Sequence, residues 1–378
     1  MLIYNAEVYT MSGGIIPGGW VSFENGKITG TGEKTSRPSP AGGDIDAGGA
    51  ALTPGLIDAH CHLGLFEDSQ RENDTDDCNE WGSAIAPHMR ALDAFNPLDR
   101  MVGEALRGGV TTVCVLPGSA NPIGGQAAIV KTVGKRADDM LVMAPAALKI
   151  AFGENPRLHG KLKKEAPYTR MGTAALIREA FLDAQFYART QNGDKPSYNL
   201  KHEELLNVLR RKFPVHAHAH RAHDMFTARR ISEEFGFDLV FVHATEGDLI
   251  AEELAAIGAK VITGPTYGTR SKPELHNLGF QTPVALSKAG LKPAICTDAP
   301  VLPLDSLPLM AGLAVRAGMD SYEALRAITL YPAELLRIDG RVGALKAGLD
   351  ADLVLWTSSP LNTDGKPNGV WVGGVKQA

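Results

Sequence analysis

Apolar runs that read as β-strands alternate with helical patterns along the middle of this 378-residue chain. Such alternation predicts βα units and a parallel sheet. There are eight such runs, and eight βα units close into a barrel. The expected strands are the run that ends at His60 and His62, then Val110–Pro117, Ala127–Val133, Ala147–Phe152, Phe213–His220, Leu239–Ala244, Lys260–Gly264 and Lys292–Thr297. The sequence therefore predicts an α/β fold, a (β/α)8 TIM barrel.

The two ends of the chain differ from this middle part. Residues 1–50 contain short strand-like stretches with Gly-rich turns, and residues 345–378 repeat that texture. A pair of strands is marginally stable in water by itself, so neither end should close an apolar core alone. We expect the two ends to form one small composite β-sandwich, with residues 51–344 as the barrel domain inserted between them.

Composition narrows the class of partner. Apolar residues make up 44% of the chain and charged residues 21%, which are ordinary globular values. The net charge of −5 provides no basic footprint for nucleic acid or for an anionic membrane. No run of about 20 apolar residues is present to anchor the chain in a bilayer. The expected partner is a small-molecule substrate, with no nucleic acid and no membrane.

The N-terminal residues and the cysteines indicate the compartment. Met1–Asn5 lacks the basic and apolar regions of a signal peptide. The four cysteines contain no C-x-x-C pair, and three of them lie in apolar strand-like runs, where a thiol behaves as a small buried hydrophobe. We expect a cytoplasmic protein in a reducing compartment, and a homo-oligomer.

Two histidines one residue apart end the first expected strand. On an extended strand, residues i and i+2 point to the same face, so the imidazoles of His60 and His62 should converge. The C-terminal end of a barrel strand is where active sites are built, and two imidazoles aimed at one point form half of a transition-metal site. Alone, this motif is more often structural, and the rest of the chain has to support it.

A second group of histidines lies at the end of the fifth expected strand. His216, His218 and His220 share one strand face, and His223 follows closely. Unpaired buried polar groups are costly, so three imidazoles on one buried face need a ligand or a hydrogen-bonded network to satisfy them. The alternative to a metal site is such a polar network, or a strand end exposed to solvent.

Two further strands end in groups that bind metals. The sixth expected strand ends in His243 and the last in Thr297-Asp298. Each has an ordinary explanation: a buried histidine satisfied in the core, and an aspartate that caps a helix before Pro300. The order along the chain is what distinguishes them, because it places imidazoles and a carboxylate around one barrel mouth.

With these residues in order, the chain resembles the amidohydrolase superfamily, in the branch of imidazolonepropionase-like and Xaa-Pro-dipeptidase-like proteins. The resemblance covers most of the chain and is carried by Thr53–His62, Gly109–Val113, His218–His220, His243, Thr297-Asp298 and Gly343–Val354. It implies a metal-dependent hydrolase of a C–N bond in an amide, peptide or cyclic amide.

The resemblance also implies roles for single residues. His60, His62 and Asp298 would bind one metal, and Asp298 would also be the catalytic proton carrier. His218 would be the ligand from the fifth strand and His243 the ligand from the sixth. Relatives with two metals often bridge them with a carboxylated lysine, and Lys149 stands at about that position; an ion-paired lysine is the alternative. Glu154 competes for the bridging role. The implied cofactor is a divalent metal, Zn above all, with one or two ions per chain.

Three further residues are candidates for binding substrate. His220 is a weaker ligand candidate than His218 and is expected to orient substrate or support the ligands. Arg170 and Arg221 could each pair with a substrate carboxylate through two parallel hydrogen bonds. A surface or helix-capping arginine is the alternative for both.

Two other functions use the same scaffold. A deaminase of a nitrogen heterocycle usually carries a Glu two or three residues beyond the fifth-strand histidine, and Ala219-His220-Arg221 provides no acid there. A non-catalytic scaffold typically loses ligands, whereas this chain retains them. Metal content after gentle purification separates the scaffold from the enzyme.

Overall fold

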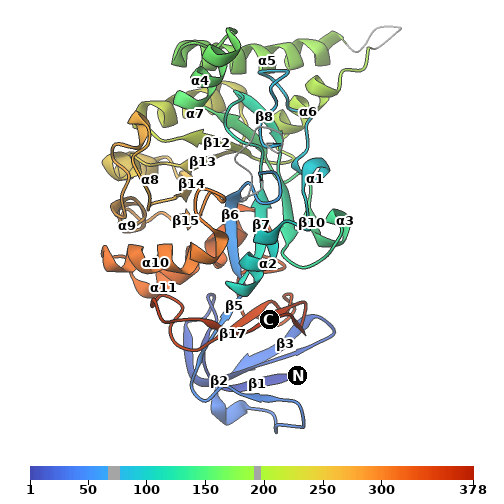
Figure 1. Ribbon diagram of the computed structural model, residues 1–378, viewed down its shortest axis with the longest axis vertical. Coiled ribbons are helices and arrows are strands. Elements are labelled where there is room, and N and C mark those ends of the chain that lie inside the picture. Colours follow the sequence, from blue (N-terminus) through green and yellow to red (C-terminus); the bar gives the residue numbers. More distant parts are fainter. Residues whose placement is uncertain (67–76, 191–196) are drawn as a thin grey trace.

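The computed structural model describes residues 1–66, 77–190 and 197–378, and in Figure 1 an α/β body lies above a sheet built from both chain ends. In this sheet β1 (Leu2–Tyr9) pairs with β2 (Ile15–Glu24) and with β5 (Ala51–Pro54), and β16 (Leu353–Trp356) pairs with β5. The remaining strands are β3 (Lys27–Gly32), β4 (Ile45–Asp46), β17 (Pro367–Val372) and β18 (Val375–Lys376). The two ends thus share one sheet and one apolar core.

Strands β6 (Leu56–Cys61) and β7 (Val110–Val115) begin the α/β body and pair in parallel. A second sheet holds β11 (Leu148–Ala151), β12 (Val215–Ala219), β13 (Leu239–His243), β14 (Lys260–Thr263) and β15 (Ala294–Ile295), paired in parallel in that order. Every residue of β6, β7, β11 and β12 is buried. Because helices cover such strands, they appear in the sequence as nearly continuous apolar runs.

The third expected strand departs from the all-parallel prediction. Its residues form β9 (Ala128–Lys131), which runs antiparallel to β7, while β8 (Ile123–Gln126) runs antiparallel to β11. The strand β10 (Leu141–Met143) pairs antiparallel with β9. A parallel crossover needs a dozen or more residues. The short stretches between these strands lack that length, so the chain reverses direction instead.

Helices follow most of the parallel strands. The helical patterns that alternate with the apolar runs in the sequence include α5 (Arg170–Thr190), α7 (Ala222–Phe235), α8 (Ala251–Ala256) and α9 (Gln281–Lys288). The others are α1 (Ala91–Ala94), α2 (Arg100–Arg107), α3 (Ala137–Met140), α4 (Glu154–Lys163), α6 (Leu200–Leu209), α10 (Leu307–Arg316), α11 (Ser321–Arg326) and α12 (Leu330–Leu335). Within the described ranges, none of the helices has the length and apolar character needed to cross a membrane.

A buried ion pair joins the end sheet to the body. Lys131 of β9 contacts the carboxylates of Asp350 and Asp352, which lie just before β16. All three side chains are largely buried. Asp352 also accepts a hydrogen bond from the backbone N–H of Gly373. Charged groups are rarely buried without partners, so these contacts fix the end sheet against β9.

Candidate metal centre

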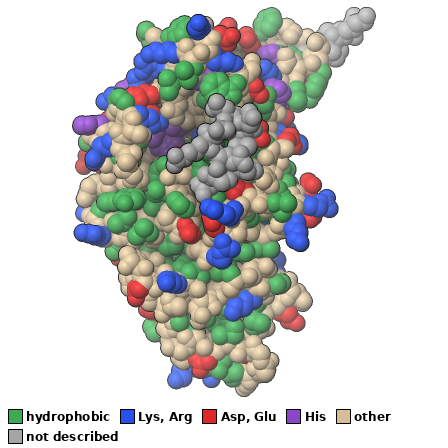
Figure 2. Space-filling view, in the orientation of Figure 1, with side chains coloured by type: hydrophobic (Ala, Val, Ile, Leu, Met, Phe, Trp, Pro, Cys, Tyr) green, Lys and Arg blue, Asp and Glu red, His purple; other side chains and the backbone are tan. Residues whose placement is uncertain are grey.

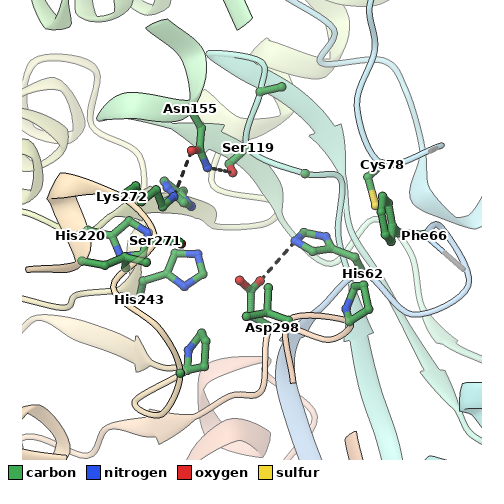
Figure 3. Close-up of a pocket in the computed structure, with 18 of the residues that line it drawn as sticks. His62, Phe66, Cys78, Ser119, Asn155, His220, His243, Ser271, Lys272 and Asp298 are labelled. Carbon is green, nitrogen blue, oxygen red and sulfur yellow. Dashed lines mark hydrogen bonds and ion pairs between the residues drawn. The ribbon is translucent and has the colours of Figure 1, made fainter. Parts of the chain in front are cut away.

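The imidazoles at the end of β6 meet the carboxylate that follows β15. The Nε2 atoms of His60 and His62 each lie 3.3 Å from Oδ1 of Asp298. Figure 3 shows the contact between His62 and Asp298. His60 is fully buried and His62 nearly so. Nδ1 of His62 lies 2.8 Å from the carbonyl oxygen of Leu116 and must donate to it, which leaves the lone pair on Nε2. The structure therefore brings together the three residues that the sequence places at two distant strand ends.

A second set of imidazoles adjoins this group. Ligand atoms of His218, His220 and His243 lie within 4.8 Å of one another, and so do those of His60, His243 and Asp298. His243 thus belongs to both sets. Its Nδ1 donates to the carbonyl oxygen of Gly264 at 2.7 Å, which turns the Nε2 lone pair away from that bond.

The backbone is strained at two of these residues. His243 has φ of 72° and Asp298 has φ of 56°, both in the left-handed region. Non-glycine residues there cost on the order of 1–3 kcal/mol each, and such strain clusters at functional sites. The conformation turns the backbone sharply where β13 ends and where the chain leaves β15. The strained backbone at these two residues thus directs their side chains toward the centre.

Burial determines the protonation of the cluster. It lowers the pKa of His60, His218 and His220 well below the usual range and that of His243 to about 4. For Asp298, burial by itself raises the pKa, but the contacts with His243, His60 and His62 outweigh it and hold the pKa well below its usual range. Neutral imidazoles around an ionised carboxylate are the protonation states that metal ligation requires.

The residues present fit a divalent cation. In the described part of the chain, both ring nitrogens of His218, Nδ1 of His60 and Oδ1 of Asp298 are buried without a hydrogen-bond partner. The lone pair of His62 faces Oδ1 of Asp298, which is also an acceptor, so the pair requires a cation or a proton between them. Imidazole nitrogens with one carboxylate form a donor set suited to Zn²⁺ and similar ions.

Lys149 contacts the cluster from β11. Its side chain is fully buried, and Nζ lies 3.2 Å from Nε2 of His60. Burial lowers the pKa of Lys149 to about 8. Glu154, the competing candidate, begins α4, and its backbone N–H donates to Oε2 of Glu274. Of these two candidates for the bridging position, Lys149 is the one with a described contact to a histidine of the centre.

Asp58 is a buried residue that the sequence did not single out. One of its oxygens accepts from the backbone N–H of His60, and the other accepts from both the N–H and the hydroxyl of Thr297. Burial raises the pKa of Asp58 to about 6. The carboxylate joins β6 to the segment after β15 and so positions both His60 and Asp298. A signal existed, since Asp58 lies on the same strand face as His60.

We expect Asp58→Asn to lower turnover about 10- to 100-fold, because an amide cannot accept all three hydrogen bonds and its NH₂ would oppose a donor. Stability should fall by about 1.5–3 kcal/mol. Steady-state kinetics and urea unfolding measure the two effects. Thr297→Val, which removes only the hydroxyl, should show smaller changes in the same direction. Wild-type turnover in Asp58→Asn would mean that Asp58 does not position the centre.

Glu274 is a second residue that sequence reasoning missed. It lies in the segment after β14, is fully buried, and places Oε1 3.7 Å from Nε2 of His220 and 3.9 Å from Nε2 of His218. Lys272 pairs with the same oxygen at 2.8 Å. Burial alone raises the pKa of Glu274, but His220 and Lys272 outweigh it, so the net pKa is lowered. Nothing local in the sequence indicates this carboxylate.

The three candidate substrate-binding residues lie in different surroundings. His220 lines a cavity of about 720 Å³, and its Nδ1 lies 2.7 Å from the Thr245 hydroxyl. Arg170 pairs with Asp224 at 3.1 Å, and Arg221 pairs with Glu246 at 3.3 Å. The described residues that line the cavity include neither arginine.

The cavity has a polar floor and an apolar outer wall. His62, His218, His243 and Asp298 line it together with His220, and histidine side chains are visible in a hollow of the face shown in Figure 2. The larger apolar side chains of the lining are Phe66, Trp81, Leu158, Leu162, Pro265, Tyr267, Leu275, Leu278, Pro300, Val301 and Leu302. A concave, mostly apolar space with a few convergent polar groups is typical of a small-molecule site.

Comparison with known proteins agrees with this geometry. Residues 51–376 match the amidohydrolase family. The amidohydrolase tasK of Hapsidospora irregularis is 33% identical over 372 residues, which cover 88% of this chain and 37% of tasK, so the chain spans little more than a third of that relative. An imidazolonepropionase of Sphingopyxis alaskensis is 26% identical over 404 residues, covering 93% of this chain and 90% of that protein.

Among solved structures, an amidohydrolase from Thermotoga maritima is 39% identical and superposes with a TM-score of 0.94, covering 99% of this chain and 98% of that one. This likeness implies a TIM-barrel-like α/β fold. The family expected from the histidine motifs is thereby confirmed. The chain belongs to the amidohydrolase family of hydrolases.

Proposed function

We propose that the protein hydrolyses a C–N bond of a small molecule, in an amide, peptide or cyclic amide. The observation that carries this proposal is the convergence of His60 and His62 on Asp298, with 3.3 Å between each Nε2 and Oδ1 of Asp298. His62 and Asp298 line the cavity, and His60 lies buried beside them. The relatives named amidohydrolase and imidazolonepropionase support the same reaction class.

The proposed site requires a divalent cation, most simply Zn²⁺. His60, His62 and Asp298 would hold one ion, and His218 and His243 would hold the same ion or a second one. Such a cation would lower the pKa of water to about 7, which makes hydroxide accessible at neutral pH. Carboxylated Lys149 is the proposed bridge if two ions are present.

Lys149 suits carboxylation because the reaction with CO₂ requires a neutral amine. With its pKa lowered to about 8, roughly a tenth of the side chain is neutral at pH 7, far more than for an exposed lysine. The carbamate that forms carries a negative charge, and the neutral imidazole of His60 lies beside it. Cation binding would then favour the carboxylated form.

Asp298 is the proposed proton carrier. Its carboxylate is ionised, and Oδ1 has no hydrogen-bond partner among the described residues. It would accept a proton from the attacking water and deliver that proton to the departing nitrogen, as a base and then an acid. The imidazole of His220 lines the same cavity and would stabilise negative charge that develops on the substrate oxygen.

Removal of metal tests the proposal. Chelator-treated protein should lose hydrolysis of dipeptides, N-acyl amino acids and cyclic amides, and one or two equivalents of Zn²⁺ per chain should restore it. The measurement pairs product release with metal stoichiometry. If the chelated protein, shown to be metal-free, kept its turnover, the proposed mechanism would be wrong. If no C–N substrate were hydrolysed by the metal-loaded protein, the proposed reaction would be wrong.

A further inference from the structure

Lys272 is the only lysine or arginine among the described residues that line the cavity. It lies in the segment after β14, between the cavity-lining Ser271 and the buried Glu274. Its side chain is 27% exposed, whereas that of Glu274 is fully buried. The ammonium therefore faces the cavity and its counter-ion lies behind it.

Two contacts hold the ammonium in place. Nζ forms an ion pair with Oε1 of Glu274 at 2.8 Å. It donates to Oδ1 of Asn155 at 3.0 Å, and Asn155 in turn donates to the Ser119 hydroxyl at 2.7 Å (Figure 3). A lysine ammonium has three donors. In the described structure one of them is directed to Asn155 and the charge is paired with Glu274, which leaves an N–H for a ligand in the cavity.

The fixed ammonium lies close to the floor of the site. Glu274 Oε1 is shared between Lys272 and the imidazole of His220, at 2.8 Å and 3.7 Å. A substrate therefore needs only a few bonds between a carbon at the centre and a group held by Lys272. An N-acyl amino acid has that form, because only the nitrogen and Cα separate its amide carbon from its carboxylate carbon.

The two arginines that the sequence offered for a carboxylate are engaged elsewhere. Asp224 accepts from Arg170, and Glu246 lies beside the guanidinium of Arg221, outside the cavity lining. An anionic group that enters this cavity therefore meets one side-chain cation of the described protein, Lys272.

The outer wall suits the other end of such a substrate. Trp81 is about half exposed and packs against His159 with ring centroids 4.4 Å apart and ring planes tilted by 30°. Leu158 and Leu162 of α4 are more than half exposed and line the same cavity. Exposed large apolar side chains gathered at a cavity mark a binding surface. An acyl group or an apolar amino-acid side chain fits this wall.

We propose that Lys272 binds the carboxylate of the substrate, and that the natural substrates are small N-acyl amino acids or dipeptides with an apolar group. This assignment rests on the proposed hydrolysis of a C–N bond. The expected contact is a charge-assisted hydrogen bond between the Lys272 ammonium and the carboxylate, with Asn155 and Glu274 as positioning residues for the lysine.

The test compares binding of N-acetyl-L-leucine with that of its neutral carboxamide. Metal-loaded Asp298→Asn protein, which should not turn the ligands over, allows calorimetric measurement of both. We expect the acid to bind at least ten-fold more tightly than the amide. Adding Lys272→Met should abolish this preference, and adding Lys272→Arg should preserve it. Lys161→Met, which removes an exposed lysine of α4, should leave it unchanged.

The outcomes separate this inference from the proposed function. Equal binding of acid and amide, no binding of either, or an unchanged preference in Lys272→Met overturns the role of Lys272, whatever the wild-type protein hydrolyses. Failure of the wild-type protein to hydrolyse any C–N substrate bears on the reaction alone. If Lys272→Met is unstable because Glu274 loses its counter-ion, the double variant Lys272→Met/Glu274→Gln removes both charges and answers the same question.

Discussion

Asp298→Asn is expected to lower kcat by about 10²- to 10⁴-fold while the protein keeps most of its metal. Asparagine has nearly the shape of aspartate and retains an oxygen toward His60 and His62, but its amide cannot take up a proton from water and return it to a leaving nitrogen. The measurement pairs steady-state kinetics on the best C–N substrate with metal analysis of the same sample.

The matched control for this prediction is Asp138→Asn. Asp138 is 75% exposed on α3 and contacts only Arg136 among the described ion pairs, so the same chemical change there should leave turnover unaltered. Near-wild-type kcat in Asp298→Asn with full metal content would remove Asp298 from proton transfer. A loss of metal in proportion to activity would instead make Asp298 a ligand without a proton role.

Lys149→Met is expected to lower turnover on the order of 10²-fold and to reduce bound metal by one equivalent per chain if the wild-type protein holds two. Methionine fills nearly the same volume but has no amine to react with CO₂ or to contact His60. Metal analysis and native mass spectrometry, which detects the added mass of one CO₂ on the wild-type chain, measure both parts.

Stability separates this functional loss from misfolding. Lys149 forms none of the ion pairs of the described residues, so Lys149→Met removes the cost of burying a cation without leaving a partner charge unpaired. The free energy of unfolding of Lys149→Met should therefore equal or exceed that of the wild-type protein. Full activity and unchanged metal content in Lys149→Met would show that the lysine is structural, and a wild-type chain without added CO₂ mass would exclude the carboxylated bridge.

Local sequence patterns predicted the parallel strands and the order of the candidate ligands. Parallel strands buried on both faces are continuous apolar runs, and polar residues that interrupt such runs at their ends stand out. That is why His60, His218, His243 and Asp298 were recognisable in the sequence. The resemblance to the amidohydrolase superfamily followed from the same stretches, because it depends on the order in which these strand ends occur along the chain.

Only the tertiary structure shows which side chains and strands pair with one another. The sequence did not predict the direction of one strand. Ala128–Lys131 has the pattern of a strand, but the stretch that connects it to the preceding strands is too short for a parallel crossover, and it runs antiparallel to β7. Likewise, no local pattern could show that Arg170 pairs with Asp224 while Lys272 lines the cavity and pairs with the buried Glu274.

One physical cause separates the features that the sequence determined from those that the tertiary structure decided. Periodicity and apolar content act between neighbours along the chain, so the sequence by itself determined the strands, the strand-end histidines and Asp298. Ion pairs, hydrogen bonds and cavity walls form between residues far apart in the chain, such as Asp58 with Thr297 or Glu274 with His218. Only the packed structure brings those groups within reach, and it therefore decided which residues contact the centre and which charge faces the cavity.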